Sequence, residues 1–212
     1  NETLNIDLFF HKKKQNLITT NNRGLYNYIQ HLSKNRHLIG TILQKKETTD
    51  FNEINFCLQW TTTEKEIILC YTNGILQKDG GTHLQGLKNG IVNSIRKLLQ
   101  KKKYKKHFLK QVTWNTVKEG LIIILSIKML NPKFSSQAKE KLISQEIKKK
   151  IENFFYNELE KFFEKNNEIQ NEIFNKILNV IKTKKKKELN KKNILQTYST
   201  KLANCQKKNY KE

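Results

Sequence analysis

A near-continuous apolar run from Leu121 to Leu130 constrains the fold of this chain more than any other feature. The run is rich in isoleucine, and such runs are typical of a central strand that is covered on both faces. It is too short to cross a bilayer as a helix, and no other apolar run of the chain is longer. The chain therefore needs a sheet with packing partners on both sides of this strand.

Periodic patterns elsewhere supply the other strands and the helices. Alternation of apolar residues predicts strands at 54–60 and 67–72, with a further possible strand at 38–44 and a hairpin at 4–18. Helical spacing of apolar residues predicts helices at 24–34, 84–98, 143–163 and 168–187. The order strand–strand–helix–strand–helix around a short sheet predicts an α+β fold rather than a doubly wound one.

The boundaries of two helices follow from capping and charge. Thr82 comes directly after Gly80-Gly81, and a threonine there is a favourable N-cap. We expect the last helix to end at Lys184–Lys187, because lysines oppose the negative end of a helix dipole.

The formal net charge is +22, which predicts a polyanionic partner. Nucleic acid is the first expectation and an anionic membrane surface the weaker one. Almost all the basic residues are lysine, so contacts to phosphates are expected rather than bidentate base recognition, which favours arginine. The abundance of lysine, asparagine and isoleucine is also typical of an AT-rich genome, an alternative source for part of this charge. Charge runs such as Lys101–Lys106 and Lys184–Lys187 are usually solvated faces.

The sequence contains no recognisable catalytic constellation or metal site. Cys57, Cys70 and Cys205 lack metal-ligand spacing and an even-numbered disulfide framework, which fits a reducing compartment. Gly80-Gly81 alone does not form a phosphate-binding loop. His83 and Glu119 have no evident nucleophile or acid–base partner, so we interpret both as structural.

The polar stretch Asn131–Lys139 lies between the apolar run and the next helix and contains the only proline of the chain. Such a loop can deliver side chains to a fixed point. Gln137 offers amide donors, and the ammonium of Lys139 suits a phosphate. From composition alone, a solvated loop is the simpler interpretation.

Several blocks of the chain together resemble the transducer region of the DNA gyrase B family, the B subunits of type IIA topoisomerases. The blocks are Leu58-Gln59-Trp60, Tyr71–Ile75, Asp79–Gly86, Lys118–Leu121, Asn131–Leu142 and Lys201–Gln206. They recur in the order and spacing of that family from about Gly24 onward.

The resemblance implies a left-handed β-α-β transducer fold with long C-terminal helices. It implies three regions: a trailing edge of an ATPase domain (1–20), the transducer (21–165), and a helix and linker toward a TOPRIM domain (166–212). The ATP site and the TOPRIM motif are expected outside this segment, which alone should neither hydrolyse ATP nor cut DNA. Its polar loop corresponds to the family's "QTK" loop, so Gln137 and Lys139 are expected to contact the terminal phosphate of ATP. Ala138 departs from the family's usual threonine.

The resemblance also implies cofactors, partners and a place in the cell. ATP and Mg²⁺ are expected in the intact protein. The expected partners are DNA, a second B subunit, and the A subunit of gyrase, in an A2B2 complex, with no membrane. Because the transducer domains of this family line a cavity for DNA, the resemblance makes seven lysines the candidates for DNA contact: Lys101, Lys102, Lys103, Lys184, Lys185, Lys186 and Lys187. The compartment implied is the cytoplasm of a bacterium, an endosymbiont being one possibility and a plastid-type organelle the alternative. Two other functions stay open: the equivalent segment of topoisomerase IV, and a stand-alone basic nucleic-acid-binding protein.

Overall fold

The computed structural model describes residues 4–10, 13–19, 24–49 and 52–205, with side chains described for 24–49 and 52–187. The strands are β1 (Leu4–Phe10), β2 (Lys13–Thr19), β3 (Leu38–Thr48), β4 (Asn52–Thr61), β5 (Ile67–Thr72), β6 (Ile75–Leu76) and β7 (Leu121–Met129). The helices are α1 (Gly24–Ser33), α2 (Thr82–Lys101), α3 (Lys106–Leu109), α4 (Trp114–Val117), α5 (Gln145–Lys165) and α6 (Asn167–Cys205). The α+β prediction is confirmed.

The predicted central strand, β7, lies in the middle of a five-stranded sheet of order β3-β4-β7-β5-β6. It pairs antiparallel with β4, where Leu125 faces Phe56, and parallel with β5, where Leu125 faces Cys70. Because β5 and β7 are parallel, the chain must cross over between them, and α2 lies in that crossover. The sheet is therefore mixed, and β5, α2 and β7 form a β-α-β unit.

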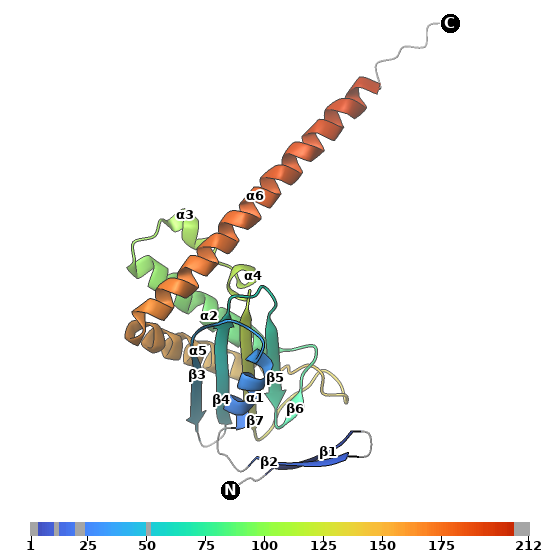
Figure 1. The fold of residues 1–212 in the computed structure, drawn as a ribbon, viewed down its shortest axis with the longest axis vertical. Coiled ribbons are helices and arrows are strands. Elements are labelled where there is room, and N and C mark those ends of the chain that lie inside the picture. Colours follow the sequence, from blue (N-terminus) through green and yellow to red (C-terminus); the bar gives the residue numbers. More distant parts are fainter. Residues whose placement is uncertain (1–3, 11–12, 20–23, 50–51, 206–212) are drawn as a thin grey trace, which may run out of the picture.

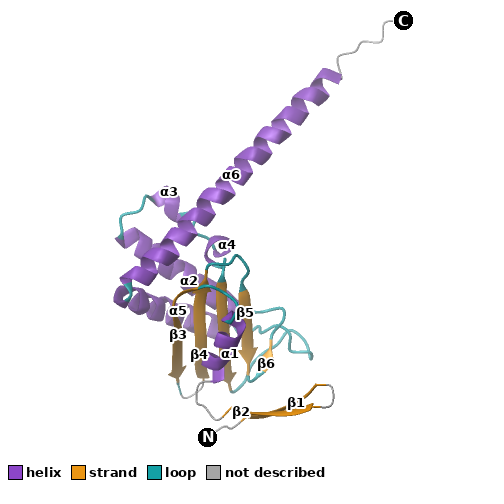
Figure 2. Ribbon diagram, viewed as in Figure 1, coloured by secondary structure: helices purple, strands orange, loops and turns teal. Residues whose placement is uncertain are grey.

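Helices cover both faces of the sheet (Figure 2). On one face α2 and α5 pack against each other and the sheet, with the Phe56 ring 4.3 Å from that of Phe155. On the other face Ile29 of α1 packs in a smaller cluster with Ile122 and Ile124. Residues Leu121–Leu125 are fully buried, as the apolar run predicted.

The amino-terminal hairpin is confirmed as a separate two-stranded antiparallel sheet of β1 and β2. Residues 1–3, 11–12 and 20 of the predicted trailing edge lie outside the described residues, as do 206–212 of the predicted linker.

Two predicted helix boundaries are wrong. Helix α6 does not end at Lys184–Lys187 but continues to Cys205, so these lysines lie within the helix and do not cap its dipole. The sequence from 167 to 205 has no glycine or proline to stop a helix, and its commonest residue is lysine, a good helix former. The N-cap of α2 is Gly81, with φ 140°, and Thr82 is the first helical residue.

Candidate functional site

The polar loop after β7 presents its tip to solvent. Gln137, Ala138 and Lys139 are all exposed. The backbone N–H of Lys139 donates to the carbonyl of Ser136 at 3.1 Å, which closes a tight turn. Lys139 has φ 55°, a left-handed conformation that lysine rarely adopts. The tip is thus a defined turn with two side chains in solvent.

The base of the loop is joined to the segment before α2 by backbone hydrogen bonds. Leu142 N–H donates to the carbonyl of Gly80 at 3.1 Å, and Thr82 N–H donates to the carbonyl of Leu142 at 2.9 Å. A Cβ at Gly81 would overlap the backbone of Leu142, so glycine permits this close approach. Further along, Asp79 N–H donates to the carbonyl of Glu140 at 3.1 Å. These bonds fix the loop to the start of α2.

Gln77 connects the tip to the same segment through a side chain. Its amide Nε2 donates to the carbonyl of Lys139 at 3.4 Å, and the side chain is almost fully buried. Sequence reasoning missed this contact, because Gln77 and Lys139 lie 62 residues apart and no periodic pattern joins them. The only signal was its position before Gly80-Gly81.

The exposed amide of Gln137 and ammonium of Lys139 can donate hydrogen bonds to an anion carried by another domain. A metal does not fit here: within 24–49 and 52–187, no group of three or more His, Cys, Asp or Glu side chains could hold one. The described helices include none that is both long and apolar enough to cross a membrane.

The lysines predicted near the end of α2 differ in their surroundings. The ammonium of Lys101 lies between Glu160 at 2.7 Å and Glu164 at 2.8 Å. That of Lys102 lies 5.3 Å from the centre of the Phe174 ring. Lys103 is exposed at a left-handed position with φ 62°. Lys101 is thus engaged within the protein, and Lys103 is better placed for an external anion.

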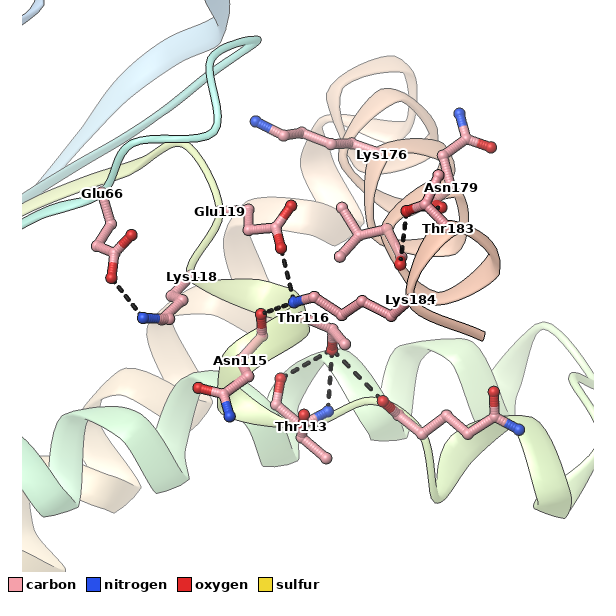
Figure 3. Close-up of polar contacts among 12 residues, drawn as sticks. Glu66, Thr113, Asn115, Thr116, Lys118, Glu119, Lys176, Asn179, Thr183 and Lys184 are labelled. Carbon is pink, nitrogen blue, oxygen red and sulfur yellow. Dashed lines mark hydrogen bonds and ion pairs between the residues drawn. The ribbon is translucent and has the colours of Figure 1, made fainter. Parts of the chain in front are cut away.

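The lysines predicted on α6 also divide into two groups. Lys184 Nζ lies 2.6 Å from Glu119 and donates at 2.6 Å to the carbonyl of Asn115 (Figure 3). Lys185, Lys186 and Lys187 are exposed. Glu119 is therefore one half of an ion pair to α6, which agrees with its structural interpretation.

His83 lies in the first turn of α2 and is completely buried. Burial lowers its pKa to about 4, so the ring is neutral near pH 7. Neither ring nitrogen has a hydrogen-bond partner among the described residues. The structural interpretation of His83 agrees with this environment.

Cys57 and Cys70 are also buried, and burial raises the pKa of each thiol to about 12. Both are therefore unreactive core residues, as their positions in strands predicted.

Residues 24–193 match the family model "DNA gyrase B". Gyrase B of Rickettsia bellii is 32% identical over 145 residues, which is 68% of this chain and 18% of the relative. Gyrase B of Caulobacter vibrioides is 33% identical over 144 residues, with the same coverage. The chain thus spans 18% of the length of these curated relatives.

Two solved structures share the fold. The 43K ATPase domain of Thermus thermophilus gyrase B, crystallised with an aminocoumarin, has a TM-score of 0.72 at 22% identity and covers 86% of this chain and 49% of its own. The topoisomerase IV ATP-binding domain of Francisella tularensis has a TM-score of 0.64 at 24% identity, covering 81% and 46%. From the extent of the family match and the identity to these relatives, the chain belongs to the DNA gyrase B family.

Proposed function

We propose that this chain is the transducer segment of a gyrase-type B subunit, and that it couples ATP binding and hydrolysis to DNA strand passage and supercoiling. The observation that carries the proposal is the exposed tip at Gln137 and Lys139 on a base tied to α2. A side chain that contacts a ligand in another domain must be exposed, and the backbone that carries it must be held in place by the rest of its own domain.

In this mechanism, Gln137 and Lys139 donate to the terminal phosphate of ATP in the neighbouring ATPase domain. These contacts exist in only one arrangement of the two domains, so the nucleotide stabilises that arrangement by their free energy. Loss of the phosphate removes the contacts, and the domains return to their other arrangement. Mg²⁺ would be held by groups outside the described residues.

The loop and helix α6 lie at opposite ends of β7 (Figure 1). Nine strand residues span roughly 30 Å at about 3.3 Å each. Because β7 is hydrogen-bonded on both sides and buried on both faces, it can transmit a displacement with little deformation. The proposed path runs from the tip through β7 to α6.

The equivalent segment of topoisomerase IV is the second candidate, supported by the fold shared with the Francisella tularensis domain. We favour gyrase because the family model and the relatives named above are gyrase B. The proposed partners are accordingly DNA, the A subunit of gyrase and a second B subunit in an A2B2 complex. The proposed compartment is the cytoplasm of a bacterium.

The test uses a complete B subunit that carries this segment, assembled with the A subunit of gyrase and saturated with DNA. Lys139→Ala should lower ATP turnover strongly, because it removes the proposed phosphate contact. Lys141→Ala is the matched control, since Lys141 is an exposed lysine of the same loop. Unchanged turnover in the Lys139 variant would sink the proposal.

A further inference from the structure

Helix α6 packs on the body of the protein for only part of its length. Among its described side chains, at 167–187, the buried apolar residues are Ile173, Phe174, Ile177, Val180 and Ile181. Beyond them the helix continues to Cys205 and projects away from the sheet (Figure 1). The direction of this projection is therefore set by contacts made near residue 181.

Lys176 makes an unusual contact at this point. Its ammonium, carried by α6, donates to the carbonyls of Thr61 and, at 2.8 Å, of Thr63 in the turn after β4. Gly120 lies directly against it: a Cβ there would overlap Nζ and both carbonyl oxygens. Burial lowers the pKa of Lys176, with Glu119 and Glu64 acting in the opposite direction.

Lys184 forms the second contact, two turns further along α6. Its ammonium reaches the Glu119 carboxylate and the Asn115 carbonyl, both at 2.6 Å (Figure 3). Lys185–Lys187, which follow, are exposed. Lys184 thus contacts the body where the helix leaves it.

Both lysines converge on the residues immediately before the central strand. Glu119 accepts from Lys184, and Gly120 lies against Lys176, while β7 begins at Leu121. The other end of β7 leads into the loop that bears Lys139. Two points of attachment on one helix restrict both its translation and its rotation relative to the strand.

We propose that Lys176 and Lys184 are positioning residues for coupling: they lock the direction of α6 to β7, so that displacement of the loop reorients the projecting helix. This inference rests on the proposed transducer function. The apolar residues up to Ile181 account for the attachment of the helix, but nonpolar packing is non-directional. Hydrogen bonds to fixed carbonyls and a carboxylate define an orientation.

The test compares three lysine-to-methionine variants of the same helix: Lys176→Met, Lys184→Met and, as control, the exposed Lys182→Met. Methionine keeps an unbranched chain and removes the charge. Each variant is made in a complete B subunit that carries this segment, assembled with the A subunit of gyrase. The two measurements are DNA-stimulated ATP turnover and the number of supercoils introduced per ATP hydrolysed.

The Lys176 and Lys184 variants should retain ATP turnover within about twofold and lose at least about fivefold in supercoils per ATP, a typical coupling factor. Lys182→Met should change neither quantity. Lys184→Arg, which keeps a cation within reach of Glu119, should restore the ratio. If the Lys176→Met variant does not fold, the Lys184→Met variant alone tests the inference. The side chain of Lys184 is 41% exposed, so its replacement should leave the fold intact.

An unchanged ratio in both variants would overturn the inference, and so would a parallel loss of both activities. Lys139→Ala separates this inference from the proposed function. If Lys139→Ala abolishes turnover while the Lys176 and Lys184 variants keep a normal ratio, only the positioning role fails. If Lys139→Ala has no effect, the proposed function itself fails.

Discussion

Lys139 joins an exposed side chain to a backbone conformation that costs a non-glycine residue about 1 kcal/mol or more. Within the described part of the chain, its backbone is hydrogen-bonded to Ser136 through N–H and to Gln77 through the carbonyl. These contacts offset the strain and leave the ammonium free to move. Through its hydrogen bond to the Lys139 carbonyl, Gln77 therefore helps to fix the backbone of Lys139.

Replacing Gln77 by methionine tests this positioning. The variant keeps the length of the side chain but loses the amide donor, and a typical net hydrogen bond is worth about 1 kcal/mol. We expect ATP turnover of the assembled enzyme to fall about fivefold, less than for Lys139→Ala. Turnover equal to that of the unaltered protein would show that the backbone bonds of the loop base suffice.

His83 gives the chain a dependence of stability on pH. Its folded pKa of about 4 lies below the usual value of 6.5, so the unfolded chain binds more protons between these values. Stability is therefore fully present above pH 6.5 and is lost as pH falls toward 4. Between pH 7.5 and pH 5 the loss from this residue should be about 2 kcal/mol.

Thermal unfolding at the two pH values measures this loss. A change of about 2 kcal/mol corresponds to a fall in Tm of about 4–8 °C for a chain of this size. Methionine at position 83 cannot be protonated. Between pH 7.5 and pH 5, the Tm of the His83→Met variant should therefore fall by about 4–8 °C less than the Tm of the unaltered protein. Identical pH dependence in the two proteins would contradict the buried neutral state of His83.

Among the elements, the joint between the loop and α2 depends on Gly81. Alanine there would meet the Leu142 backbone and would also have to adopt φ 140°. We expect Gly81→Ala to destabilise the chain by about 2–3 kcal/mol in urea unfolding. Gly24→Ala is the matched control, because a Cβ at Gly24 meets nothing within 4 Å. Equal midpoints for the two variants would refute this role for the joint.

The sequence was sufficient to predict the strands and helices that bury apolar residues, because burial imposes a regular spacing. Strand β7 and helix α2 are examples. It did not predict the second half of α6, where the helical periodicity of the apolar residues is weak. Nor did it predict the Lys184–Glu119 pair, since two charges 65 positions apart leave no local signal. The loop tip was found through its likeness to a family motif.

Across the protein as a whole, the lysines that give the chain its net charge of +22 differ in their surroundings. Lys101 and Lys184 contact glutamates within the protein, so a phosphate would have to compete with those carboxylates. At the neighbouring exposed residues Lys103 and Lys185–Lys187, we expect a phosphate to bind without this competition. The lysines that we expect to contact DNA most strongly are Lys103, Lys185, Lys186 and Lys187.

Exchange of these four lysines for glutamine tests the DNA contact directly. Each phosphate contact adds roughly 0.9 to the slope of log affinity against log salt concentration, so the slope should become shallower by up to about 3.6. The control removes the same charge from exposed lysines elsewhere, Lys34, Lys65, Lys78 and Lys110. DNA affinity is measured by fluorescence anisotropy from low to moderate salt. If both sets flatten the slope equally, the net charge attracts DNA without a defined contact surface, and the assignment of these four lysines is wrong.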